Sequence, residues 1–272
     1  MKQSRHIAII LLSAWVITFT ACTEEITVDL NSADPQLVIE GSVSTAGNPV
    51  IMLSRSVNFD DPNDFPKVEN AIVELSDDDG NREILPETSP GLYTTPFING
   101  KEGSTYSLSV TFGEEQLWAE SKIPQRVELD SIIVKRRTTP AFPGSSENGT
   151  FYQVQVTYKD PAGIVNYYRF LEKVNGITTH QYVFDDLLND GQEVTQVLFD
   201  IERNLESGDL LEIEMQCIDR SVYDYFNSLI LAEGGPGGPN TPSNPVSNIE
   251  GSELGYFSAH TSEDKEVRIQ YE

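Results

Sequence analysis

Short stretches of alternating apolar and polar residues constrain this fold more than any other feature of the chain. Residues 105–110 read Thr-Tyr-Ser-Leu-Ser-Val, so every second side chain is apolar. This period of two is typical of a half-buried β-strand. Similar stretches follow one another about every 8–12 residues, separated by turn-forming residues, which is typical of a β-sandwich. We therefore predict a mainly β protein in which residues 35–124 form a β-sandwich domain.

Strand patterns resume after Pro124, so we expect a second β-rich domain over residues 125–272. The predicted strand over 127–134 places Val127, Leu129, Ser131 and Ile133 on one face. The strand over 151–158 is expected to turn Tyr152, Val154, Val156 and Tyr158 to one side. Cys217 lies in an alternating stretch and is interpreted as a buried strand residue rather than a reactive thiol.

The pattern changes at residues 220–232, where apolar residues recur at helical spacing. We predict one amphipathic helix near 220–232, with Asp219 as its N-cap. A Pro/Gly loop follows over 234–245, and it cannot sustain a helix or a strand. It is either an ordinary surface loop or, together with the helix, a contact surface for a partner.

The N-terminus has the layout of a secretory signal. Lys2 and Arg5 precede an apolar run, and small residues stand just before Cys22. Phe-Thr-Ala-Cys resembles a bacterial lipobox, which implies cleavage after residue 21 (1–21 as signal peptide) and lipidation of Cys22. Residues 22–34 are then a flexible tether. The alternatives are an ordinary signal with a chance cysteine, or a transmembrane helix, for which the run is shorter than the roughly 20 residues required.

The chain is strongly acidic, with a net charge of −25 at pH 7. Such a surface repels nucleic acid, so no nucleic-acid partner is expected. Two acidic segments, Asp77–Asn81 and Asp185–Gly191, offer the oxygen ligands that Ca²⁺ prefers, although neither matches an EF-hand loop. Asp and Asn are also common turn residues. We expect turns here, with Ca²⁺ as the alternative and no other cofactor.

No pattern of catalytic residues stands out. His180 and His260 have no neighbouring acid and nucleophile in the sequence that would indicate a triad, and no spacing indicates zinc. We therefore expect a protein that is not an enzyme. Its aromatic pairs are candidates for contact with a protein or a glycan. The candidate contact residues are Tyr223, Tyr225, Tyr256 and Phe257.

Several segments resemble one family along nearly the whole chain. They are Leu37–Gly41, Ala71–Leu75, Ser221–Phe226 and, most specifically, Asn248–Gly251 followed by Leu254–Ala259. The family is an uncharacterised group of Bacteroidota outer-membrane lipoproteins, a domain of unknown function typically encoded beside TonB-dependent receptors. The first domain also resembles an immunoglobulin-like or carboxypeptidase-regulatory-like sandwich.

The resemblance implies a cell-envelope lipoprotein anchored by lipid such as palmitate in the outer membrane. Glu24 and Glu25 after Cys22 resemble a surface-export signal, which favours the cell surface over the periplasmic face. The implied function is a non-catalytic accessory or ligand-binding partner of a TonB-dependent nutrient-uptake receptor. One alternative is a surface hydrolase that degrades glycans or peptides with paired carboxylates. Another is a structural or adhesive surface lipoprotein.

Overall fold

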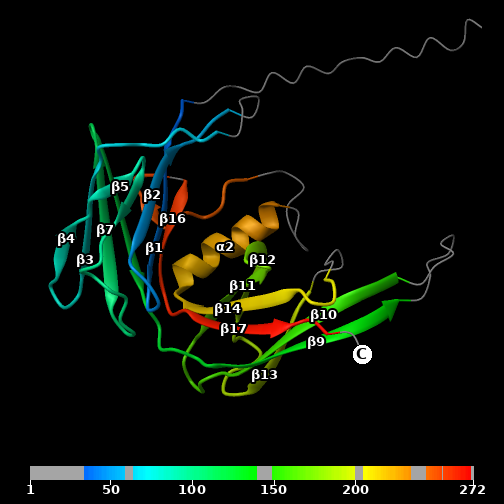
Figure 1. Ribbon diagram of the computed structural model, residues 1–272. Helices are drawn as coiled ribbons and strands as arrows, with labels where there is room; N and C mark the ends of the chain where they lie inside the picture. The colour runs from blue at the N-terminus through cyan, green and yellow to red at the C-terminus, as the bar shows by residue number, and fades with distance from the viewer. Residues whose placement is uncertain are drawn as a thin grey trace, which may run out of the picture. The chain divides into compact units, whose positions relative to one another are not determined.

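The computed structural model describes residues 34–58, 64–139, 149–199, 205–233, 243–252 and 254–270. Its strands and its helix belong to one compact unit that spans residues 35–57 and 61–272. Figure 1 shows the β-sheets and helix α2 (Arg220–Ala232) of the described residues. Within the described residues, no helix is both long enough and apolar enough to cross a membrane.

Two five-stranded sheets in the described residues form the first sandwich. The first sheet has the order β16 (Gly255–His260), β1 (Leu37–Ser44), β2 (Val50–Arg55), β6 (Leu92–Thr94) and β5 (Glu87–Ser89). The second has the order β15 (Ile249–Glu250), β8 (Glu115–Lys122), β7 (Thr105–Phe112), β3 (Ile72–Asp77) and β4 (Arg82–Ile84).

The inner faces of these two sheets share one apolar core. Ile39 and Leu53 of the first sheet and Leu75 and Leu108 of the second are each at most 1 % exposed. In β7, Tyr106, Leu108 and Val110 are buried, and the serines between them are only partly so. The expected mainly β fold, with a sandwich at its N-terminal end, is confirmed.

The structure differs from the expected division at residue 124, because two C-terminal strands return to the first sandwich. β16 pairs with β1 in parallel, with Gly255 opposite Ile39. β15 pairs with β8. Gly255 has φ +96, and a Cβ there would lie 2.0 Å from the Ile39 carbonyl oxygen. Only glycine allows this approach of the two backbones. Residues 249–260, expected in the second domain, therefore complete the first.

The remaining strands form two further sheets with a core of their own. The third sheet has the order β13 (Glu193–Leu198), β10 (Gly149–Lys159) and β9 (Leu129–Thr139). The fourth has the order β12 (Ile177–Asp185), β11 (Tyr167–Val174), β14 (Leu210–Ile218) and β17 (Glu263–Arg268). Tyr158, Phe170 and Met215 are buried between them, and Cys217 is buried as expected.

The expected face of the 127–134 strand is wrong beyond Leu129. Leu129 pairs with Tyr158 and Ser131 pairs with Thr157, which leaves Asp130 as an extra residue in β9. Such a bulge shifts the alternation by one position. Ile132 and Val134 therefore pack on the core, whereas Ile133 is exposed.

Helix α2 has the bounds that the periodicity predicts. Asp219 Oδ1 accepts a hydrogen bond from the Val222 backbone N–H at 3.0 Å, which confirms Asp219 as the N-cap. Asp219 Oδ2 also accepts from Ser121 Oγ and from the Lys122 backbone N–H at 2.9 Å. The start of the helix is thus fixed to β8 of the first sandwich.

Candidate functional site

The structure brings two of the four candidate aromatic residues together. The rings of Tyr225 on α2 and Tyr256 on β16 lie 5.0 Å apart between centroids. Tyr223 packs instead on Tyr167 of β11, at 4.9 Å. Phe257 is 0 % exposed in the core of the first sandwich. Successive residues of a strand point to opposite faces, so Tyr256 faces the helix and Phe257 faces the core. A buried ring contacts no partner, so the expected contact role of Phe257 is wrong.

The aromatic residues surround a cation that the sequence analysis did not single out. The guanidinium carbon of Arg169, on β11, lies 3.6 Å from the centroid of the Phe226 ring. Arg169 donates to Gln216 Oε1 at 3.3 Å and to Gln181 Oε1 at 2.8 Å. Its Nε is buried and donates to no acceptor in the described residues. Burial lowers the pKa of Arg169, while Tyr256, Glu214 and Tyr225 act in the opposite direction.

Glu214 is an acid on this face of β14, and it pairs with Lys173 rather than with Arg169. Burial opposes ionisation of Glu214, but hydrogen bonds from Gln216 and Ser262 and the charge of Lys173 lower its pKa overall. The Lys173 ammonium lies 3.3 Å from Glu214 Oε2. No carboxylate oxygen lies within 4.0 Å of the Arg169 nitrogens in the described part of the chain. Arg169 is therefore a half-buried cation without a direct counter-ion there.

Arg169 lines a cavity of about 390 Å³ on the outer face of the fourth sheet. β11, β12 and the end of α2 supply its walls. The lining residues are Arg169, Leu171, Thr178, Thr179, His180, Gln181 and Glu233. His180 Nδ1 lies 3.7 Å from Glu172 Oε1, and the Glu172 side chain is fully buried. The cavity thus combines one cation, hydroxyl and amide groups, and an acid.

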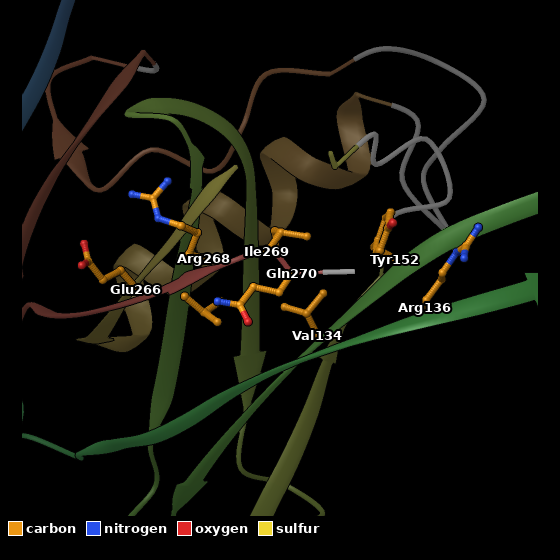
Figure 2. Close-up of a pocket in the computed structure, with 8 residues that line it drawn as sticks. Val134, Arg136, Tyr152, Glu266, Arg268, Ile269 and Gln270 are labelled. Carbon is orange, nitrogen blue, oxygen red and sulfur yellow. The ribbon is translucent and has the colours of Figure 1, made fainter. Parts of the chain in front are cut away.

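A second cavity, of about 760 Å³, lies beside the C-terminal residues and is shown in Figure 2. Val134 and Ile269 lie between two arginines, Arg136 and Arg268. Arg268 donates to the Gly208 carbonyl at 2.7 Å. Both arginines are exposed, so water screens their charges.

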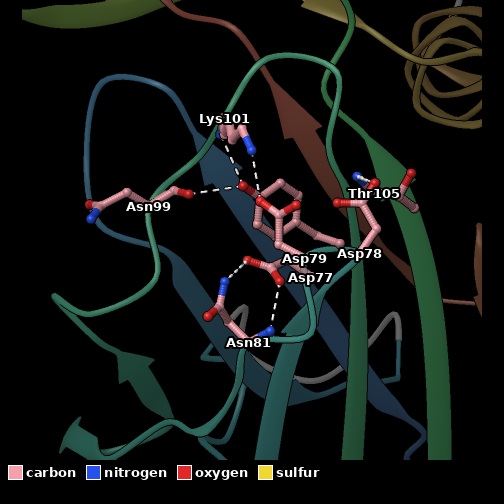
Figure 3. A network of polar contacts seen from close by, with 8 residues as sticks. Asp77, Asp78, Asp79, Asn81, Asn99, Lys101 and Thr105 are labelled. Atoms are coloured by element: carbon pink, nitrogen blue, oxygen red, sulfur yellow. Dashed lines mark hydrogen bonds and ion pairs between the residues drawn. The ribbon is translucent and has the colours of Figure 1, made fainter.

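The first acidic segment expected as a turn or a Ca²⁺ site is a β-hairpin turn (Figure 3). Asp77 accepts from the backbone and side-chain nitrogens of Asn81, at 2.9 and 2.7 Å. Asp78 accepts from the Thr105 backbone N–H at 3.1 Å, and Asp79 pairs with Lys101 at 2.7 Å. Each of the three carboxylates therefore has at least one donor from the chain itself.

The second acidic segment contributes to a cluster that also includes a residue from another loop. One oxygen from each of Asp160, Asp186 and Asp190 lies within 4.8 Å of the others. Such oxygens are the ligands that Ca²⁺ prefers, so these are the residues that could hold it. The cluster also accepts hydrogen bonds from the chain. Tyr168 Oη and Gly191 N donate to Asp160, Asn166 N donates to Asp186 at 2.8 Å, and Gly163 N donates to Asp190 at 2.6 Å.

The same two loops expose four large aliphatic side chains, which we call the apolar loop tips. They are Ile164 (54 % exposed), Val165 (71 %), Leu187 (81 %) and Leu188 (84 %). Because the hydrogen bonds of the aspartate cluster join the loops, these side chains stand on a fixed backbone. The sequence does show one signal for this cluster, because Leu187 and Leu188 are adjacent aliphatic residues inside the acidic turn segment. The sequence analysis considered only the acidic residues of that segment.

The remaining sequence-predicted residues lie in the interior or outside the described residues. Ser258 Oγ lies 2.9 Å from His260 Nδ1, and both residues are buried. Burial lowers the pKa of His260 to about 4, and the charge of Arg169 acts in the same direction. Cys22, residues 1–33 and residues 234–242 of the Pro/Gly loop lie outside the described residues.

The comparison with family models matches residues 23–266 to the family described as Domain of unknown function (DUF4249). The chain belongs to the DUF4249 family. This confirms the expected membership in a domain of unknown function, and the family description assigns no activity. The comparison with curated proteins gives no match.

Proposed function

We propose that this DUF4249 protein is an outer-membrane lipoprotein that binds a TonB-dependent receptor and catalyses no reaction itself. A basic start, an apolar run and small residues before Cys22 support lipidation at that cysteine. The family match begins at residue 23, so the leader lies outside it. Several acyl chains hold a protein firmly at a membrane, since each buried methylene contributes about 0.8 kcal/mol.

The apolar loop tips are the single observation that carries the binding role. Exposed aliphatic clusters on folded proteins are typical of interaction sites. Burying one such side chain contributes about 1.5–3 kcal/mol. Ile164 and Val165 also line a groove of about 380 Å³ with Ile123, Pro124 and Ile218, which offers space for a partner's side chain. The joined loops reduce the ordering cost of binding.

The charge of the chain favours a protein partner over the lipid surface. With a net charge of −25, the chain is repelled by anionic headgroups. The loop tips therefore suit an apolar protein surface better than an anionic bilayer. We propose that they contact the receptor while the lipid at Cys22 holds the protein in the same membrane, facing the cell surface.

The test is purification of the lipidated full chain from solubilised outer membranes, followed by mass spectrometry of what accompanies it. The variant carries Leu187→Ser and Leu188→Ser. The matched control carries Ile84→Ser and Phe97→Ser, which replaces exposed apolar residues of the first sandwich, 63 % and 81 % exposed. We expect a receptor barrel to accompany the wild type and the control, and to be lost from the loop variant.

Two results would contradict the proposal. Recovery of the wild type without any barrel protein would remove the receptor role. Turnover of a glycan or peptide that a single Asp or Glu substitution abolishes would favour the hydrolase alternative. Mass spectrometry of Cys22 tests the anchor separately, because an unmodified thiol there would contradict lipidation.

A further inference from the structure

We propose that the cavity beside Arg169 binds the carboxylate group of a small ligand. The carboxylate site is independent of the receptor proposal, because none of the apolar loop tips lines this cavity. Arg169 is half-buried, and its Nε is fully buried. A guanidinium removed from water is stable in a protein when it is paired or fully hydrogen-bonded. Arg169 is neither, since its two acceptors are neutral amides and its Nε has none in the described residues.

The surroundings of Arg169 fix the guanidinium in place without neutralising it. Phe226 stacks on one face of the group at 3.6 Å, and an aromatic ring stabilises a cation without pairing with it. Gln181 and Gln216 hold its Nη atoms from the two neighbouring strands. Each Nη carries two hydrogens and donates one of them to a glutamine. The second hydrogens of this fixed guanidinium, at the wall of a cavity, are suited to bidentate recognition of a carboxylate.

The other lining residues narrow the class of ligand. Thr178 and Gln181 offer neutral polar groups, and Leu171 offers an apolar wall. A cavity of about 390 Å³ is within the range of small-molecule sites. Glu233 also lines it and repels a second negative charge. The site therefore favours a ligand with one carboxylate on a compact uncharged or zwitterionic body over a dianion such as phosphate.

Calorimetric titration of the detergent-solubilised full chain tests this assignment. The probe is benzoate. Benzamide is the control ligand, because it has the same ring and a neutral amide in place of the carboxylate. We expect saturable binding of benzoate that is at least about tenfold tighter than that of benzamide. Inorganic phosphate should compete at least about tenfold more weakly than benzoate. Equal affinities for benzoate and benzamide, stronger competition by phosphate, or no saturable benzoate binding would each overturn the proposal.

The decisive variant is Gln181→Glu, which places a carboxylate where the amide oxygen now lies 2.8 Å from Arg169 Nη2. It keeps the side-chain size and supplies the missing counter-ion. We expect benzoate affinity to fall at least about tenfold while the midpoint of thermal unfolding rises. Unchanged benzoate affinity, or a lower unfolding midpoint, would contradict the assignment.

Two controls separate this site from the others. Arg136→Gln alters an arginine of the second cavity and should leave benzoate binding unchanged. The Leu187→Ser and Leu188→Ser variant should also retain it, so failure of the receptor proposal and failure of this one are distinguishable. Loss of benzoate binding in either control would overturn the assignment to Arg169.

Discussion

Gly255→Ala tests the return of β16 to the first sandwich. At this position φ is +96, and the added Cβ would lie 2.0 Å from the carbonyl oxygen and 2.7 Å from the nitrogen of Ile39. The backbone conformation alone costs an alanine about 1–2 kcal/mol. Both close atoms are backbone, so β16 must move away from β1, and forced displacement of packed groups costs about 1–3 kcal/mol more. We expect the free energy of unfolding to fall by about 2–5 kcal/mol in total.

The matched control is Gly80→Ala in the β3–β4 turn, where φ is +92 and nothing lies within 4 Å of the added Cβ. Its free energy of unfolding should fall by only about 1–2 kcal/mol, which is the cost of the backbone conformation alone. The assay is urea unfolding of protein that begins at residue 22, monitored by tryptophan fluorescence. Trp118 is the single tryptophan of that protein, because Trp15 lies in the removed segment. Equal losses in the two variants would refute the close approach of β16 to β1.

Two further predictions concern the helix start and the buried histidine. Asp219→Ala removes the N-cap and the contacts with β8, so it should cost about 2–4 kcal/mol in urea unfolding. Asp224→Ala, which removes an exposed pair with Arg220, should leave the midpoint nearly unchanged. Burial holds the pKa of His260 at about 4, below its unfolded value of 6.5, so stability should fall as pH drops between these values. The loss should reach about 3 kcal/mol and be absent in His260→Gln, and parallel pH profiles for the two proteins would contradict it.

Local patterns in the sequence predicted the elements well where one period dominated. The helix has the expected bounds because its apolar spacing and the Asp219 cap indicate the same start. The strands around Leu108 and Val156 bury the expected faces because both alternate without interruption. These features depend on neighbours in the chain, which a single sequence displays directly.

Features that depend on distant pairing were not predictable from local pattern. β15 has only two residues, too few for a period, and it forms by pairing with β8. The bulge at Asp130 is a mismatch between two strands, and neither strand alone shows it. Phe257 and Tyr256 looked equivalent as adjacent rings until pairing with β1 assigned their faces.

The candidate sites were predictable only in part, for the same reason. Tyr225 and Tyr256 were candidates because they are aromatic. The nearby cation, Arg169, could not be inferred from the sequence, because it depends on the packing of β11 against α2. Asp160 joins Asp186 through loops that are distant in the sequence. Composition identified the residue types, and tertiary structure identified which of them meet.

Photocrosslinking from position 188 in living cells tests the central claim most directly. A photoreactive amino acid replaces Leu188 in the full chain, and a matched protein carries it at Ile84. We predict one crosslinked product between position 188 and a TonB-dependent receptor, and no such product from position 84. Crosslinks from position 188 to lipid alone, or the same products from both positions, would contradict it.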